Sequence, residues 1–192
     1  MSSALATHLL NLSVMQQSEI PQPVSNDELQ QAVDILAKFE PGYLPFPLFM
    51  AIARLVVFSI IEIVPLRRMA NGELEVLLTQ RPADDPLWPN MWHNPGVVVL
   101  ASDATGSFAD PFDRVLHKEL GISETAPDPV FVEISFHHTR RGTDMAMVHY
   151  VELDADFTPT HGTFYPLSTL PKNTIESNEP LIRRAAAAFA KQ

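Results

Sequence analysis

The chain has 192 residues, with 23 Asp or Glu against 13 Lys or Arg, so its formal net charge is −10 at pH 7. This length favours one domain with a substantial core and a short appendage. The hydrophobic fraction of 46% is typical of a globular protein and argues against a disordered or fibrous chain. The acidic balance disfavours a nucleic-acid polymer or an anionic membrane surface as partner, whereas a phosphorylated small molecule stays compatible with it.

The sequence contains no cysteine, which excludes a disulfide framework, a thiol nucleophile, an iron–sulfur cluster and a cysteine zinc site. Residues 1–22 contain neither Lys nor Arg, and polar residues interrupt their apolar run, so we expect no signal peptide. The apolar stretch 43–65 contains Arg54 and Glu62 and is interrupted by prolines, so we expect no membrane span. These features predict a cytoplasmic protein.

The N-terminal part of the sequence predicts one amphipathic helix. Residues 25–28 supply polar cap residues, apolar residues then recur at helical spacing up to Ala37, and Pro41-Gly42 ends the pattern. We therefore predict an extension over residues 1–45 that carries this helix. Its apolar face is expected to cover its own domain, and a homodimer formed through this face is the alternative.

The rest of the chain, 46–192, alternates short apolar runs with turns and predicts a second, larger domain. A strand is expected from Ile52 to Arg67, in which the β-branched run 55–61 is buried, and a hairpin turn at 70–72 leads to another strand over 74–80. Further strands are expected near 97–100, 130–136 and 145–153, and helices over 110–120 and after Pro180. This pattern predicts an α+β fold with a mixed sheet between helices.

Three segments of this domain resemble the Nudix superfamily: Trp92–Gly96 (WHNPG), Arg114–Ile122 (RVLHKELGI) and Phe164–Pro171 (FYPLSTLP). The box of that family reads G-x5-E-x7-R-E-U-x-E-E-x-G-U, where U is a bulky aliphatic residue, and it commonly follows W-x-x-P-G. The resemblance extends over residues 50–190 and implies an α/β/α sandwich. In active members it also implies divalent-metal-assisted hydrolysis of a diphosphate linked to another moiety.

The box of this chain keeps its scaffold residues and loses most of its carboxylates. Its three helix carboxylate positions hold Val115, Lys118 and Glu119. On an α-helix these positions lie within an arc of about 100°, where carboxylates could converge on a hard cation, so we expect the three side chains to face one shared cavity. The loop between Gly96 and Arg114 is about four residues longer than the family pattern and contains no glutamate.

Local signals predict how this helix begins and ends. Asp110 is expected to cap it, Pro111 to occupy its first position, and Asp113 to act as the reciprocal acid of a capping box. Gly121 can supply a left-handed residue after the last turn.

The resemblance assigns roles to three residues of the helix. Glu119 is the predicted catalytic residue and Mg²⁺ ligand, with a surface glutamate as the alternative. Arg114 corresponds to the arginine that orients a catalytic carboxylate, and a structural pair with Asp110 or Asp113 is the alternative. Lys118 is the predicted contact to a substrate phosphate, with a solvated lysine as the alternative.

Trp92, His93 and Arg140 complete the predicted substrate-binding residues. Trp92 and His93 could line a pocket, although an aromatic residue at this place is often a packing residue. Residues 137–142 predict a strand end that enters a basic turn, where Arg140 could contact an anionic ligand or be solvated. The adjacent His137 and His138 must point to opposite faces of a strand, which disfavours a zinc site.

The resulting functional prediction is a Nudix-like hydrolase of a nucleoside diphosphate derivative or another organic pyrophosphate, with Mg²⁺ as cofactor. Its alternative is a catalytically inactive Nudix-fold module that binds a ligand or regulates. The family resemblance favours the pyrophosphohydrolase. The replacements at Val115 and Lys118 favour the inactive module.

Overall fold

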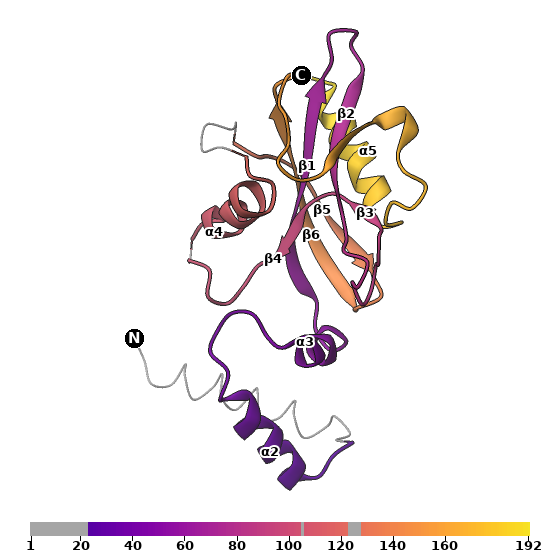
Figure 1. Cartoon of the computed structure of the whole chain (residues 1–192). Helices are drawn as coiled ribbons and strands as arrows, with labels where there is room; N and C mark the ends of the chain where they lie inside the picture. The colour runs from indigo at the N-terminus through magenta and orange to yellow at the C-terminus, as the bar shows by residue number, and fades with distance from the viewer. Residues whose placement is uncertain (1–22, 105, 123–127) are drawn as a thin grey trace. The chain divides into compact units, whose positions relative to one another are not determined.

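The computed structural model describes residues 23–104, 106–122 and 128–192, and the chain divides into two units between Glu40 and Pro41. The first unit contains helix α2 (Asn26–Leu36), as predicted (Figure 1). Ser25 and Glu28 form a capping box: the Ser25 backbone N–H donates to Glu28 Oε2 at 2.8 Å, and the Ser25 hydroxyl accepts from the Glu28 N–H. The domain boundary after residue 45 stays a prediction.

The second unit is built on a seven-stranded mixed sheet with the order β3-β2-β1-β6-β5, in which β4 also pairs with β1 and β7 with β2. Strands β1 and β6 are parallel, and every other pair is antiparallel. The strand bounds are β1 (Phe58–Arg68), β2 (Leu74–Gln80), β3 (Trp92–His93), β4 (Gly96–Val98), β5 (Val130–His138), β6 (Thr143–Leu153) and β7 (Thr163–Pro166).

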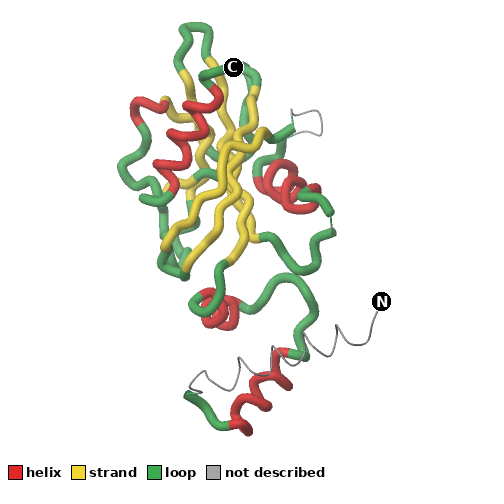
Figure 2. The backbone as a smooth tube through the Cα atoms, turned by 180° about the vertical axis from the view of Figure 1, so that it is seen from behind, coloured by secondary structure: helices red, strands yellow, loops and turns green. Residues whose placement is uncertain are grey.

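Helices cover both faces of this sheet (Figures 1 and 2). Helix α5 (Asn178–Phe189) lies on one face, where Ile60 and Val64 of β1 pack in the same core cluster as its buried side chains. Helix α4 (Ala109–Asp113) and the π-helical turn η1 (Arg114–Glu119) lie on the other, with Ile61 and Ile63. Because strand side chains alternate between faces, β1 supplies both cores. The predicted α/β/α sandwich is confirmed.

The first predicted strand is wrong at its beginning. Phe46–Ala53 forms helix α3, and β1 starts only at Phe58. Leu55 is 83% exposed, and Val56 and Val57 are exposed as well, so the run 55–57 is not buried. A short apolar run does not by itself distinguish a helix from a strand, which explains the error. None of the helices in the described part of the chain has the length and hydrophobicity required to span a membrane.

The β5–β6 hairpin confirms the predicted strand end and basic turn. The Thr139 N–H donates to the Gly142 carbonyl at 2.8 Å and closes the turn. A Cβ atom on Gly142 would lie 2.0 Å from the carbonyl oxygen of Ala53, at the end of α3. Only glycine therefore fits where the hairpin approaches that helix.

The predicted helix over 110–120 exists, but its expected N-terminal cap is wrong. The helix begins at Ala109, its N-cap residue is Phe108, and no side chain caps it. The carboxylate of Asp110 instead accepts from the N–H of Ala104 at 2.7 Å, and Pro111 lies inside the helix. Gly121 has φ of 65° and supplies the expected left-handed residue after the helix end.

Candidate functional site

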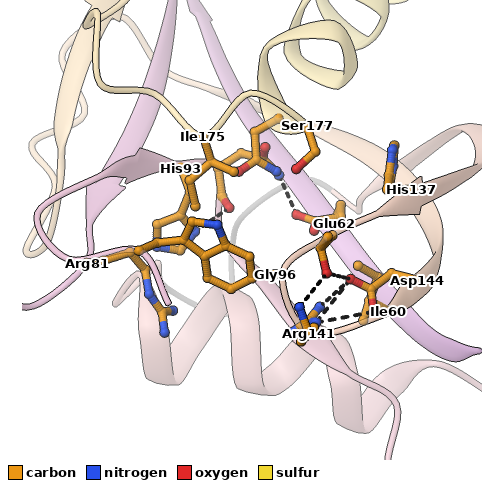
Figure 3. A pocket seen from close by; sticks show the side chains of 14 residues that line it. Ile60, Glu62, Arg81, His93, Gly96, His137, Arg141, Asp144, Ile175 and Ser177 are labelled. Atoms are coloured by element: carbon orange, nitrogen blue, oxygen red, sulfur yellow. Dashed lines mark hydrogen bonds and ion pairs between the residues drawn. The ribbon is translucent and has the colours of Figure 1, made fainter. Parts of the chain in front are cut away.

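A cavity opens on the α5 side of the sheet, where β1 changes its antiparallel partner. β1 pairs with β4 through Ile60–Glu62 and with β2 through Leu66–Arg68, so β2 and β4 part between these two segments. The cavity has a volume of about 80 Å³ and is open to solvent at its mouth. Its polar wall includes Glu62, Arg81, His93, Asn94, His137 and Arg141 (Figure 3).

Glu62 reaches this cavity because it alternates along β1 with Ile61 and Ile63, which face the other core. Asn94, which is 1% exposed, donates through Nδ2 to Glu62 Oε2 at 2.6 Å. A Cβ on Gly96 would lie 2.6 Å from the same oxygen, so glycine leaves the space that the carboxyl group occupies. Burial raises the pKa of Glu62 to about 8, and the positive charge of Arg141 opposes this rise in part. Glu62 is therefore mostly uncharged at pH 7.

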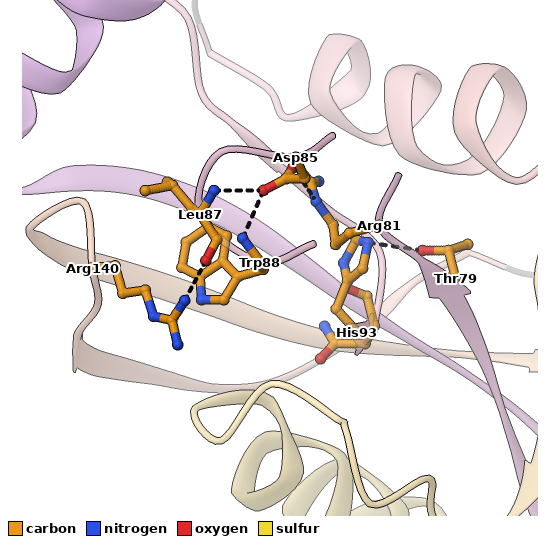
Figure 4. A network of polar contacts seen from close by, with 8 residues as sticks. Thr79, Arg81, Asp85, Leu87, Trp88, His93 and Arg140 are labelled. Atoms are coloured by element: carbon orange, nitrogen blue, oxygen red, sulfur yellow. Dashed lines mark hydrogen bonds and ion pairs between the residues drawn. The ribbon is translucent and has the colours of Figure 1, made fainter. Parts of the chain in front are cut away.

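Carboxylates hold both arginines of the cavity wall. Arg141 Nη2 lies 2.8 Å from Asp144 Oδ2, and the Asp144 side chain is only 2% exposed. The Arg81 Nε–H donates to Asp85 Oδ2 at 2.9 Å. The other oxygen of Asp85 accepts the backbone N–H groups of Leu87 and Trp88, which fixes the loop that carries Asp85 (Figure 4). Both guanidinium groups thus have defined positions at the wall.

The two histidines of the cavity are uncharged at pH 7. Burial lowers the pKa of His93 to about 4, and the positive charge of Arg81 lowers it further. His93 Nδ1 lies 2.8 Å from the Asn94 carbonyl oxygen, to which it donates, so its Nε2 accepts from the Thr79 hydroxyl 3.1 Å away (Figure 4). Burial also lowers the pKa of His137. The wall therefore combines neutral polar groups with two arginines that are paired with carboxylates, and one of these, Asp144, also lines the cavity.

Two buried atoms of this wall have no hydrogen-bond partner among the described residues. They are Asn94 Oδ1 and His137 Nε2. Buried polar atoms are usually paired, so these two have bonding capacity that the protein itself does not use.

The structure does not bring Val115, Lys118 and Glu119 to one cavity, and this expectation is wrong. Val115 is fully buried in the core. The Lys118 side chain is 71% exposed, and its Nζ lies 2.8 Å from Asp113 Oδ2. None of the three lines the cavity beside Glu62. The physical reason is the π-helical turn: the Leu120 N–H donates to the Val115 carbonyl five residues earlier, so the angular spacing of an α-helix does not apply.

Glu119 is partly buried, and this burial raises its pKa to about 7 while the charge of Arg81 lowers it. The same carboxyl group contributes to the raised pKa of Glu62. Glu119 is therefore electrostatically linked to the cavity wall without forming part of it. Its predicted catalytic and metal-binding roles stay predictions.

Arg114 pairs with Asp103, and neither of the expected partners, Asp110 and Asp113, is used. Its Nη2 donates to Asp103 Oδ2 at 3.0 Å and to the Val98 carbonyl at 3.0 Å, and its Nη1 contacts the other Asp103 oxygen. The paired Asp103 carboxylate raises the pKa of Arg114. Arg114 thus anchors the lengthened loop that precedes the helix and does not orient a helix carboxylate.

The remaining predicted substrate contacts lie in different places. His93 lines the cavity. Trp92 packs edge-to-face on Tyr165, with ring centroids 5.1 Å apart, and lies partly buried against the core cluster on the α5 side of the sheet. Arg140 lines a neighbouring hollow together with His138 and donates to the Leu87 carbonyl (Figure 4). The structure thus separates Trp92 and Arg140 from the cavity that His93 lines.

Sequence reasoning did not select Glu62, Asn94, Asp144 or Arg81 as site residues. Glu62 is one acidic residue within an apolar run, and it entered the argument only as evidence against a membrane span. A charged residue in a central strand is costly unless its surroundings accommodate it, and this was the available signal. The other three are brought to Glu62 only by the fold.

The residues of the helix do not fit the Mg²⁺ site that the family resemblance implies. Mg²⁺ prefers oxygen ligands, mostly carboxylates and water. Two of the three expected carboxylate positions hold the buried Val115 and the exposed cation Lys118. Within residues 23–104, 106–122 and 128–192, no group of three or more His, Asp or Glu side chains is arranged to hold a metal ion.

Three solved structures illustrate the similarity of the fold to known proteins. The Nudix domain of Shewanella oneidensis NrtR in complex with ADP ribose has 15% identity and a TM-score of 0.56, over 82% of this chain and 97% of that one. A Caenorhabditis elegans Ap4A hydrolase has 19% identity and a TM-score of 0.53, over 70% and 99%. The C-terminal domain of mouse MUTYH, in complex with human PCNA, has 17% identity and a TM-score of 0.53, over 71% and 92%.

A scan against protein-family models gives no match, and a search of curated proteins gives none either.

Proposed function

We propose that this chain, which has the Nudix fold, binds a phosphorylated small molecule in the cavity beside Glu62 and does not hydrolyse it with Mg²⁺. The ligand class is a nucleoside diphosphate derivative. The protein is then a ligand-binding or regulatory module built on the fold of a pyrophosphohydrolase.

The observation that carries this proposal is which residues occupy the three expected carboxylate positions on the helix and where their side chains lie. Val115 is fully buried in the core. Lys118 carries a positive charge and pairs with Asp113 at the surface. Glu119 is the remaining carboxyl group of the three positions. A site for a hard cation needs several ionised oxygen ligands at one point, which this arrangement does not supply.

The cavity wall supports an anionic ligand on electrostatic grounds. Arg81 and Arg141 supply two permanent positive charges, and guanidinium groups are favoured partners of phosphate oxygens. Glu62 is mostly uncharged at pH 7, so it does not repel a phosphate group. Asp85 and Asp144 offset part of the positive charge of Arg81 and Arg141, which favours a ligand of modest charge. The complex of the NrtR Nudix domain with ADP ribose supports the same class of ligand.

One observation favours hydrolysis as the second candidate function. Glu119 occupies the position of a box glutamate, and its pKa of about 7 suits a general base. A hydrolytic role would require this residue to act on a ligand that reaches beyond the cavity wall.

Isothermal titration calorimetry with ADP-ribose as the probe tests the binding proposal. We expect saturable binding with the same Kd, within about twofold, in Mg²⁺ and in EDTA. Arg141→Gln should weaken binding at least about tenfold, since a charge-assisted contact is lost. Arg183→Gln is the matched control, because Arg183 lies on exposed helix surface and pairs with Glu179. Failure to bind in either buffer, or binding that needs Mg²⁺, would overturn the proposal.

A further inference from the structure

Asn94 and His137 come from different elements and place unused hydrogen-bonding atoms in one cavity. Asn94 lies between β3 and β4, and His137 lies near the end of β5. The cavity wall includes both side chains, and Asn94 Oδ1 and His137 Nε2 are buried without a partner among the described residues. Such atoms are unfavourable in an empty site and become favourable once a ligand or water pairs with them.

The chemistry of the two atoms restricts what can pair with them. Asn94 uses its Nδ2 to donate to Glu62, so its Oδ1 offers only an acceptor. The pKa of His137 is lowered by burial, and a neutral imidazole nitrogen either donates or accepts, according to the tautomer. An ammonium group has only donors, so it would satisfy Asn94 Oδ1 but could not accept a hydrogen bond from His137 Nε2. A neutral hydroxyl group satisfies both atoms, because it donates and accepts.

The backbone segments that carry both side chains are held in place before any ligand arrives. The carbonyl of Asn94 accepts from His93 Nδ1 at 2.8 Å, and the next residue, Pro95, accepts from the N–H of Ile63 at 2.9 Å. His137 lies in the regular part of the β5–β6 ladder, opposite Asp144. Groups fixed by their surroundings discriminate between ligands better than mobile ones, because less ordering is needed on binding.

We propose that Asn94 Oδ1 and His137 Nε2 recognise hydroxyl groups of a sugar, so that the cavity takes the sugar phosphate part of the ligand. This inference rests on the proposed function and deepens it: the arginines attract the phosphate, and these two atoms select the moiety attached to it. A ligand with an apolar group in this position leaves both atoms unpaired and binds more weakly.

Calorimetry with two simple phosphates tests the inference. Ribose 5-phosphate carries hydroxyl groups, whereas n-pentyl phosphate presents the same phosphate on an apolar chain. We expect the folded protein to bind ribose 5-phosphate at least about tenfold more tightly, since a site built for hydroxyl groups rejects a ligand without them. Equal affinities, or tighter binding of n-pentyl phosphate, would overturn the inference. Equal affinities would also mean that water serves the two buried atoms.

Variants at two adjacent histidines test whether His137 causes the preference for ribose 5-phosphate. His137→Phe keeps a ring of similar size and removes Nε2, so the preference for ribose 5-phosphate should fall to about threefold or less. His138→Phe is the matched control, because His138 is exposed, bonds with Thr143 and does not line the cavity beside Glu62. A preference that survives in His137→Phe contradicts the assignment of His137.

A measurement on the unaltered protein covers the case in which His137→Phe does not fold. The ¹⁵N–¹H resonances of the Asn94 side-chain amide should shift on addition of ribose 5-phosphate and should not shift with n-pentyl phosphate. Unshifted resonances at saturation with ribose 5-phosphate would overturn the role of Asn94. If ADP-ribose binds and the two simple phosphates bind with equal affinity, only the inference about the sugar fails. If none of the three compounds binds, the proposed function is contradicted as well.

Discussion

The side-chain amide of Asn94 donates a 2.6 Å hydrogen bond to the carboxyl group of Glu62 and ties the segment before β4 to the middle of β1. Gly96, the residue of β4 that pairs with Glu62 in the sheet, leaves the space that this carboxyl group needs. The acidic side chain therefore stays on the floor of a cavity that faces α5. The arrangement gives the cavity a neutral polar floor at pH 7 and a wall with two arginines that are paired with Asp85 and Asp144.

The raised pKa of Glu62 predicts a specific pH dependence of stability. Its pKa is about 8 in the folded protein against a model value of 4.5, so between these values the folded state holds a proton that the unfolded state has released. Stability from the neutral carboxyl group is therefore present below pH 4.5 and is lost as the pH rises toward 8.

Glu62→Gln removes this dependence, because glutamine does not ionise and its amide oxygen can still accept from Asn94. We expect the free energy of unfolding of the wild type to fall relative to that of Glu62→Gln by roughly 1–4 kcal/mol between pH 5 and pH 8. Urea unfolding of both proteins at several pH values measures this difference in the free energy of unfolding. Glu73→Gln, at an exposed turn position, is the control and should run parallel to the wild type. A constant difference between wild type and Glu62→Gln contradicts the burial of a neutral Glu62.

The contact between Gly96 and Glu62 predicts the effect of a single added methyl group. In Gly96→Ala the new Cβ would lie 2.6 Å from Glu62 Oε2 and 3.0 Å from the Ile61 carbonyl oxygen. We expect a loss of about 1–3 kcal/mol in the free energy of unfolding, as for other overpacked sites. In the Glu62→Ala background the same substitution should cost less, because only the Ile61 contact remains. Equal costs in both backgrounds would show that Glu62 does not occupy this space.

The pair of Arg114 with Asp103 predicts a structural role for the arginine. Their side chains are 14% and 7% exposed, so Arg114→Ala leaves a largely buried carboxylate without its partner. We expect destabilisation of about 3–5 kcal/mol in urea unfolding. Arg114→Lys should recover only part of this loss, because lysine cannot contact both Asp103 oxygens and the Val98 carbonyl at once.

Arg183 provides the control for this prediction. Arg183 and Glu179 are 54% and 48% exposed, and exposed pairs contribute little to stability. Arg183→Ala should therefore cost less than about 1 kcal/mol. A tolerated Arg114→Ala with weakened ADP-ribose binding would instead indicate a role in ligand binding.

Much of the fold was predictable from local sequence signals. Helix α2 follows from its cap residues and apolar spacing, and β2 and β6 follow from apolar runs bounded by turns. The beginning of β1 did not follow, because the run from Phe46 to Val57 is apolar except for Arg54 and carries no periodicity that separates a helix from a strand. The structure divides it between α3 and an exposed connection.

The candidate site was much less predictable than the fold. The box pattern located the helix correctly, but its expected geometry assumed α-helical spacing, which the π-helical turn at Arg114–Glu119 changes. The cavity forms on the face of the sheet opposite to this helix. It is built by segments that are far apart in sequence: β1, the stretch before β4, and the β5–β6 hairpin. Only His93 among the predicted site residues lines it, and long-range strand pairing decides which residues join it.

The most direct test of the central claim is ³¹P NMR of ADP-ribose mixed with the protein in Mg²⁺ and in EDTA, with Glu119→Gln as the comparison. The account predicts that the diphosphate resonances stay intact in both buffers and that Glu119→Gln behaves like the wild type. Cleavage of the diphosphate that requires Mg²⁺ and disappears in Glu119→Gln would contradict it, and would establish Glu119 as the catalytic carboxylate of a hydrolase.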